Sequence, residues 1–267
     1  MSADTADNTM SRLVKGEINL MRSPSETLRT VKPDYIRERS AGEIIRESLR
    51  IYSRHCLVIF LVYVPAAFGT KFLIDFLQLS QHPSRGIVWA ARILGWVIPH
   101  IAGLHLTLVI SHIYLGYDLN GIRILRRSVP RLGKAILTAL LVLLLFFLYP
   151  WLMFATPVVM IEGVWGVQAL RRSWELGRYY RLRNFFVYVW PFTLYVIVYF
   201  ALSLLLLYLS LKYPTFRQLE IILFIVKDFV FSLLAPVLII IAVLLYYDMR
   251  IRNEAYDISS LAEDLRI

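Results

Sequence analysis

The chain has 267 residues, of which 58% are hydrophobic and 18% are charged. A typical soluble domain is about half apolar and about a quarter charged, so a soluble protein of this size could not bury so much apolar surface. The same composition excludes fibrous and disordered chains. The formal net charge of +10 is better explained by basic loops beside anionic lipid headgroups than by nucleic acid binding. The composition therefore predicts a multi-pass protein of the cell membrane.

The first ordered element that the sequence predicts begins at Ser40. Ser40 and Glu43 have the spacing of a capping box, which predicts a helix from there to about Arg54. Arginines recur every four residues along it, as in a helix that lies on the membrane surface. A second basic amphipathic helix is expected over residues 164–181. The expected division of the chain is a flexible cytoplasmic tail over residues 1–39, a helical membrane domain over 40–258 and a short cytoplasmic tail over 259–267.

Five long apolar segments follow the first amphipathic helix. A membrane-spanning helix needs about 20 residues, and each segment is at least that long. They cover residues 56–79, 88–115, 134–161, 185–211 and 221–247.

Two strongly basic stretches flank the third apolar segment. Residues 118–134 and residues 163–183 each hold five lysines or arginines, whereas residues 77–91 hold one and residues 212–220 hold two. Positive loops stay on the cytoplasmic side, so the third segment must enter and leave the membrane on the same side. We therefore predict a helical hairpin over residues 133–162.

The hairpin is expected to turn at Tyr149-Pro150-Trp151, because proline removes an amide donor and clashes with the preceding turn. The fold class is then an all-α polytopic transmembrane bundle of about six membrane segments, with both termini cytoplasmic. Two alternatives stay open: the short second arm is re-entrant, or the region is one kinked span with an unusually basic outer loop.

The two halves of the chain show the same order of features: a basic amphipathic helix, a span, a short loop and a second span. Residues 62–65 (Val-Tyr-Val-Pro) resemble residues 187–191 (Val-Tyr-Val-Trp-Pro), and Tyr117-Asp118 corresponds to Tyr247-Asp248. A parallel internal repeat, in which both units start and end inside, gives the same topology as the charges. Chance similarity between leucine-rich spans is the alternative.

Two stretches resemble a known family. The first is Pro157 to Gly163, continued by Ala-Leu-Arg-Arg-Ser-Trp-Glu-Leu over residues 169–176, and the second is Tyr-Tyr-Asp-Met-Arg-Ile-Arg-Asn-Glu over residues 246–254, ending at Asp257. Both resemble the membrane domain associated with glycerophosphoryl diester phosphodiesterases. The resemblance covers roughly residues 40–258 and implies a six-segment helical membrane domain.

Some members of that family carry a soluble phosphodiesterase barrel after the membrane domain. The sequence of 267 residues has no room for a barrel of about 250 residues beside the membrane domain. The resemblance therefore implies a stand-alone membrane domain without the catalytic part. Ala255 stands where the family usually has Gly, which puts only a local turn in doubt. The resemblance brings no catalytic residues with it.

Charged and polar residues in the two stretches predict a clasp at the inner face that holds the bundle together; a substrate site is the alternative. Arg171 and Arg172 precede Glu175 by four and three residues, the spacing of helical ion pairs. Asp248 follows the last span, where an arginine of the basic helix is its expected partner. The candidate clasp residues are Glu162, Arg171, Arg172, Ser173, Trp174, Glu175, Asp248, Arg250 and Arg252.

Three histidines lie on the second apolar segment, and ionisable residues inside a membrane are candidates for function. His105 and His112 share a helix face, whereas His100 points elsewhere. The sequence has no HExxH pattern and one cysteine, Cys56. We therefore expect hydrogen bonds between helices and no metal.

Two further pairs of charges lie within apolar segments. Lys71 and Asp75 are four residues apart and are expected to pair. Lys227 and Asp228 lie either at the outer interface, with the lysine reaching toward water, or in a polar cavity between helices.

The sequence contains no Walker A loop, GxSxG elbow, cysteine-rich site or dinucleotide fingerprint. We therefore expect no catalytic residue and no cofactor. The expected function is that of a non-enzymatic protein of the cytoplasmic membrane that organises or regulates lipids or partners at the inner face. Its expected ligands are anionic headgroups, with a protein partner or a second copy as further candidates. A carrier or flippase for a lipid or amphipathic solute is the alternative, and a lipid enzyme that uses the histidines is a third.

Overall fold

The computed structural model describes residues 37–79, 84–117, 119, 121–144, 152–212 and 217–254, and these residues are folded entirely as helices and connecting turns. The expected turn at residues 149–151, most of the expected tail over residues 1–39 and all of residues 255–267 lie outside this description. The helices are α3 (Ala41–Arg54), α4 (Cys56–Leu79), α5 (Arg85–Leu115), α6 (Gly121–Leu144), α8 (Ala155–Pro157), the π-helical turn η3 (Val158–Glu162), α9 (Gly166–Gly177), α10 (Arg181–Lys212) and α11 (Arg217–Glu254).

Four of the helices in the described residues are long and apolar enough to cross a membrane. The segments that qualify are Cys56–Ile74, Gly86–Leu115, Arg181–Leu209 and Ile225–Glu254. The prediction of a helical membrane protein is confirmed at this level. The same criterion finds four candidate spans in these residues and not the six segments that we expected.

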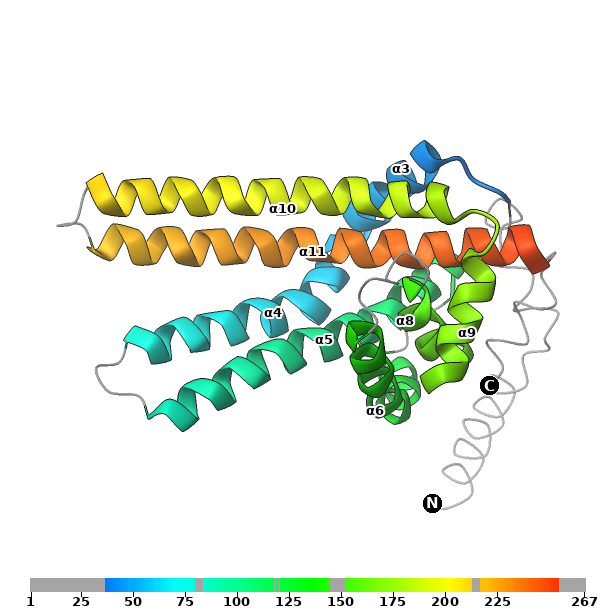
Figure 1. The fold of residues 1–267 in the computed structure, drawn as a ribbon, viewed down its shortest axis with the longest axis horizontal. Helices are drawn as coiled ribbons and strands as arrows, with labels where there is room; N and C mark the ends of the chain where they lie inside the picture. Colours follow the sequence, from blue (N-terminus) through cyan, green and yellow to red (C-terminus); the bar gives the residue numbers. More distant parts are fainter. Residues whose placement is uncertain are drawn as a thin grey trace, which may run out of the picture.

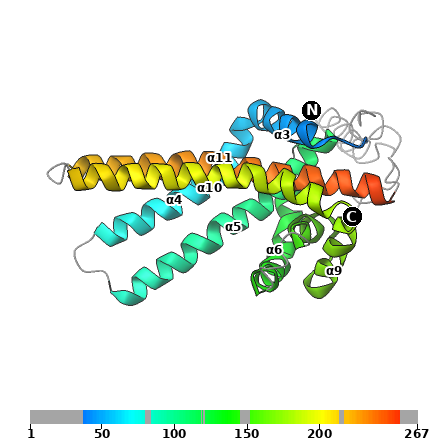
Figure 2. The same ribbon diagram turned by 45° about the horizontal axis from the view of Figure 1, so that its top comes forward.

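The four long helices form two antiparallel hairpins, α4 with α5 and α10 with α11 (Figure 1). The two hairpins diverge toward one end of the molecule, and α3, α6, α8 and α9 gather near the other end, as Figure 2 also shows. Helix α11 contacts α3, α4, α5, α9 and α10. Half of its apolar window is buried, compared with 6% for α10, so α11 is the central helix and most of α10 faces outward.

Helix α6 differs from the expected loop and hairpin arm. We expected residues 118–134 to be a basic loop and the first hairpin arm to begin at residue 133, but one helix runs from Gly121 to Leu144 and Pro130 lies within it. Arginine, leucine and lysine are good helix formers, and here they extend the helix through the basic stretch. Because of its charges, α6 does not qualify as a membrane span. The short elements α8 and η3 return along it.

The start of α3 agrees with the predicted capping box. The Ser40 hydroxyl accepts a hydrogen bond from the Glu43 amide at 3.3 Å, and the Ser40 amide donates to the Glu43 carboxylate at 2.8 Å. The hydrogen bond from the Ser40 amide lowers the pKa of Glu43. Helix α3 therefore begins at a fixed position, and it packs its buried residues Ile44, Ser48 and Ile51 toward the bundle.

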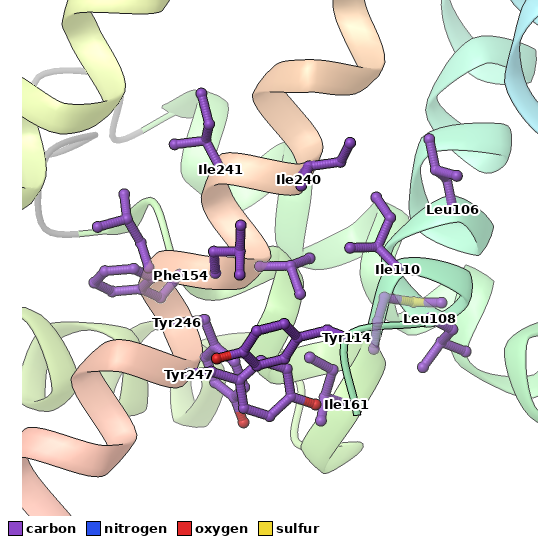
Figure 3. Packing of buried hydrophobic residues seen from close by; sticks show 14 of the residues in the cluster. Leu106, Leu108, Ile110, Tyr114, Phe154, Ile161, Ile240, Ile241, Tyr246 and Tyr247 are labelled. Atoms are coloured by element: carbon purple, nitrogen blue, oxygen red, sulfur yellow. The ribbon is translucent and has the colours of Figure 1, made fainter. Parts of the chain in front are cut away.

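Many of the most deeply buried core residues lie where α5, η3 and α11 meet (Figure 3). Tyr114, Tyr246 and Tyr247 are almost completely buried there. The rings of Tyr246 and Tyr247 pack edge to face, with centroids 5.2 Å apart, and the Ser111 and Tyr247 hydroxyls are 2.6 Å apart. Buried tyrosines are stable only when their hydroxyls have partners, so this core already contains polar contacts that position neighbouring groups.

Gly163 is a backbone position that a larger residue would disturb. Its φ is +80°, and a Cβ atom placed on it would lie 3.2 Å from the Arg131 guanidinium. We expect Gly163→Ala to lower the free energy of unfolding by about 1–2 kcal/mol, because the left-handed conformation is unfavourable for alanine. Thermal or denaturant unfolding in mild detergent measures this change.

Gly133→Ala is the matched control, because Gly133 lies within α6 and no atom is within 4 Å of the added Cβ. This substitution should raise the stability by up to about 1 kcal/mol, since alanine favours helix over glycine. Equal effects of the two substitutions would contradict the conformational argument.

Candidate functional site

Asp248, on α11, is a carboxylate with no solvent-exposed side-chain surface. One of its oxygens accepts hydrogen bonds from Arg183 Nη1 at 2.7 Å and from Arg252 Nε at 2.9 Å, and the other accepts from the Arg39 amide at 2.7 Å. A buried charge is tolerated when it is paired and hydrogen-bonded in this way. Asp248 therefore joins α10, α11 and the residues that precede α3.

The backbone and the side chain of Arg39 extend these contacts. Its carbonyl oxygen accepts from Arg252 Nη2 at 2.9 Å and also from Arg183. Its guanidinium is hydrogen-bonded to the Tyr114 hydroxyl and lies 5.1 Å from the centre of the Tyr114 ring, and the Tyr114 ring packs against Tyr247. Arg39 falls within the expected cytoplasmic tail, but it is buried and linked to α5, α10 and α11.

Glu162, at the end of η3, organises a second group of charges. Its carboxylate accepts from Arg172 Nε at 3.0 Å and from the Tyr246 hydroxyl at 2.8 Å. Arg172 also pairs with Glu254 at 2.5 Å, and Glu254 pairs with Arg250 at 3.1 Å. Burial alone would lower the pKa of Arg172, but its hydrogen bonds to Glu254 and Glu162 outweigh burial and raise that pKa. This group joins η3, α9 and α11.

These two groups of contacts share α11 and together form what we call the Asp248–Glu162 network. Its members are Arg39, Glu162, Arg172, Arg183, Tyr246, Asp248, Arg250, Arg252 and Glu254.

The candidate clasp residues divide between the network and its surroundings. Glu162, Arg172, Asp248, Arg250 and Arg252 belong to the network. The other four lie on α9: Arg171 and Glu175 form an exposed pair at 3.0 Å, the Ser173 hydroxyl accepts from the Phe154 amide at 3.2 Å, and the Trp174 ring lies 4.5 Å from the Arg181 guanidinium.

Two partner assignments differ from those expected. Asp248 contacts Arg183, at the start of α10, and no described contact joins it to the helix over residues 164–181. Arg172 pairs with Glu254 and not with Glu175, which pairs with Arg171. The spacing along one helix could not give these partners, because they come from elements that only the tertiary fold brings together. The pair of Arg172 with Glu162 agrees with the sequence, which places Glu162 just before this basic helix and predicts an arginine of the helix as its partner.

The sequence reasoning missed Arg39, Arg183, Tyr246 and Glu254 as site residues. Glu254 had a usable signal, because it stands four residues after Arg250 on one helix. Arg39 had none, since it lies in a polar stretch of mixed charge.

Two arginines of α6 hold the end of η3. Arg131 Nη1 donates to the Met160 carbonyl at 2.5 Å and to the Ile161 carbonyl at 2.9 Å, and Arg127 Nη2 donates to the Ile161 carbonyl at 3.4 Å. Cations at the last carbonyls of a helical turn are favourable. Burial, together with the nearby Arg127 charge, lowers the pKa of Arg131.

Each histidine ring of α5 is hydrogen-bonded to a hydroxyl or to a backbone carbonyl. His105 Nδ1 is 2.9 Å from the Ser128 hydroxyl, which links α5 to α6. His112 and His100 contact the carbonyls of Leu108 and Trp96 on their own helix, at 2.8 and 2.9 Å. Within the described residues, no group of three or more potential metal ligands occurs. These contacts are typical of helix packing.

The charges near the diverging end of the bundle contact other helices. Lys71 on α4 lies 3.8 Å from the Asp228 carboxylate on α11. Lys227 is buried, with its ammonium 4.9 Å from the centre of the Tyr199 ring on α10. The side chain of Asp75, the partner expected for Lys71, lies outside the described part of the structure.

Two adjoining cavities of about 260 and 330 Å³ lie beside α5 and α6. Both are lined by Trp96, His100, Ala139, Met153 and Thr156, and the smaller one also reaches α11. Their walls are mostly apolar. Neither cavity has His105 or Lys227 in its lining.

No family model matches the chain, and no curated protein or solved structure is similar to it at a significant level. Membership of the phosphodiesterase-associated membrane family therefore stays a prediction that depends on the two motifs.

The buried charge of Asp248 gives a sharp mutational test. We expect Asp248→Asn to lower the free energy of unfolding by about 3–5 kcal/mol, because Arg183 and Arg252 lose a buried counter-charge. Unfolding in mild detergent measures the change.

Glu175→Gln is the control for Asp248→Asn, since it removes one carboxylate charge from the exposed pair with Arg171. Its cost should be below about 1 kcal/mol. Similar losses of unfolding free energy in the two variants would show that burial does not strengthen the contribution of the Asp248 ion pairs.

Proposed function

We propose that this chain is a non-enzymatic integral protein of the cytoplasmic membrane that organises or regulates lipids or protein partners at the inner face. The observation that carries the proposal is the Asp248–Glu162 network. Its ion pairs join η3, α9, α10, α11 and the start of α3. A surface held together in this way presents its basic helices in fixed positions, as a binding platform requires.

The charge distribution supports a cytoplasmic position for the network. The two stretches with five basic residues each contribute to α6 and α9, which lie at the network end of the bundle (Figure 1). Cytoplasmic segments carry the excess of lysine and arginine. The start of α3 and the end of α11 lie at this end as well (Figure 2), which supports cytoplasmic termini.

The proposal includes the finer topology. Helices α3, α4 and α5 repeat the order of α9, α10 and α11: one amphipathic helix and then two long antiparallel helices. This order supports a parallel internal repeat. Helix α6, with α8 and η3 returning along it, supplies the two shorter segments between the units, and these stay on the cytoplasmic side without crossing the membrane. Together they make the six segments that the resemblance to the phosphodiesterase-associated membrane domain implies.

A carrier for a lipid or amphipathic solute is the second candidate, and the two cavities favour it. Carriers place binding sites near the middle of the membrane between repeated units. A carrier would be expected to use His105 and Lys227 to bind its solute, but neither residue lines the two cavities. His100 lines both of them. An enzyme has less support, because the described histidine contacts are to hydroxyl and carbonyl groups.

The test is to extract the full chain with its surrounding membrane in native discs and to identify the lipids and proteins retained. The proposal predicts enrichment of anionic lipid, or a reproducible protein partner, that His100→Ala leaves unchanged. One lipid or solute enriched well above the bulk membrane and lost in His100→Ala would overturn the proposal in favour of a carrier. Bulk lipid composition without a partner would also overturn it.

A further inference from the structure

Helix α6 has a different direction from the membrane-length helices. Figures 1 and 2 both show it running across the long axis of α10 and α11, at the level where α3 also lies. It contacts α5, α8, η3 and α9. If α10 and α11 cross the membrane, α6 lies along the membrane plane, near the end that carries the Asp248–Glu162 network.

One face of α6 is apolar and uncovered. Ile122, Leu125 and Val129 are 76%, 53% and 56% exposed, and their spacing of three and four residues places them on one face. The helix packs against the protein through a different face, which includes the buried residues Ile124 and Ser128. An exposed apolar stripe of this kind is typical of helices that lie in the membrane interface.

The charges of α6 all have one sign. Between Gly121 and Leu144 the helix carries four arginines and one lysine and no carboxylate. Arg127 and Arg131 are directed to the carbonyls of η3. The remaining three cations, Arg123, Arg126 and Lys134, are exposed.

The other two amphipathic helices carry acidic residues of their own. On α3, Arg50 pairs with Glu47 at 2.8 Å, and on α9, Arg171 pairs with Glu175 at 3.0 Å. Their net positive charge is therefore partly balanced within the helix. Helix α6 has no such balance, so it is the most complementary of the three to an anionic surface.

We propose that α6 is an interfacial helix that binds the phosphates of anionic phospholipids through Arg123, Arg126 and Lys134 while Ile122, Leu125 and Val129 enter the acyl region. Arginine and lysine have long apolar stems that allow their charged ends to reach the headgroups from such a position. A membrane fits better than a soluble acidic partner because the apolar stripe lies on a helix packed against the membrane-length helix α5. The proposal rests on the proposed function and names the lipid class and the residues that bind it.

The test measures the preference of the full chain for phosphatidylglycerol over phosphatidylcholine. Spin-labelled lipids of each kind are added to phosphatidylcholine vesicles that contain the protein, and the immobilised fraction is compared. Wild-type protein should prefer phosphatidylglycerol. The variant R123Q/R126Q/K134Q should lose most of this preference, since each cation near an anionic surface contributes up to about fivefold.

The matched control is R46Q/R50Q/R54Q on α3, which removes the same number of charges and should keep most of the preference. The reverse pattern, with loss in the α3 variant only, would overturn the role of α6 and leave the proposed function standing. Absence of preference in the wild type would overturn both the α6 site and binding of anionic lipid at the inner face. Loss of a co-purified acidic protein without any change in lipid preference would identify α6 as a protein-binding site and overturn its role in lipid binding.

A second measurement tests the position of α6 independently of its charge. Spin labels are placed at Leu125→Cys and, separately, at Arg123→Cys, each with Cys56→Ser to remove the native thiol. Oxygen concentrates in the acyl region and a soluble nickel chelate in water. Leu125→Cys should show the higher ratio of oxygen to nickel accessibility. Equal, water-like ratios at both positions would overturn the interfacial placement.

Discussion

Asp248 is a charged side chain without contact to solvent, and such a charge is compatible with a folded protein only when it is fully paired. Its partners are Arg183, Arg252 and the amide of Arg39. These groups come from three parts of the chain, so α10, α11 and the start of α3 must meet at one point for the charge to be tolerated. The apolar surfaces attract one another without direction, whereas this requirement is directional and selects one arrangement.

The two ends of the molecule differ in the number and length of the ion pairs described between their helices. At the network end, Glu162, Arg172 and Glu254 add a second set of pairs, and the tyrosines of α5 and α11 fill the core beneath them. At the other end the two hairpins diverge (Figure 1), and the ion pair described between them, from Lys71 to Asp228, is longer, at 3.8 Å. The cavities lie between these regions, beside α5 and α6. The molecule thus combines one end that several ion pairs hold together with another end at which the hairpins separate.

The sequence was sufficient to predict the elements with strong local signals. The capping box of Ser40 and Glu43 appears in the structure as expected, and four of the five predicted apolar segments correspond to membrane-length helices. The prediction of a loop where α6 begins was wrong, because five cations in a short stretch suggest a loop although the same residue types favour a helix. The charge pattern alone could not distinguish a basic loop from a basic helix.

Partners within the candidate site were predictable only in part. Arg171 and Glu175 pair as their spacing indicates, because both lie on one short helix. Arg39 and Asp248 are 209 residues apart in the chain, and no local pattern links an amide before α3 to a carboxylate on α11. Contacts of this kind depend on the packing of several helices, which a single sequence does not specify in a readable form.

The pairing of Asp248 with Arg183 couples α11 to α10 and holds the network end together. The most direct measurement is a double-mutant cycle of Asp248→Asn and Arg183→Gln, followed as the free energy of unfolding in mild detergent. A coupling energy of at least about 1 kcal/mol is expected for residues in direct contact. Effects that add to within about 0.5 kcal/mol, as they do for distant sites, would contradict the claim.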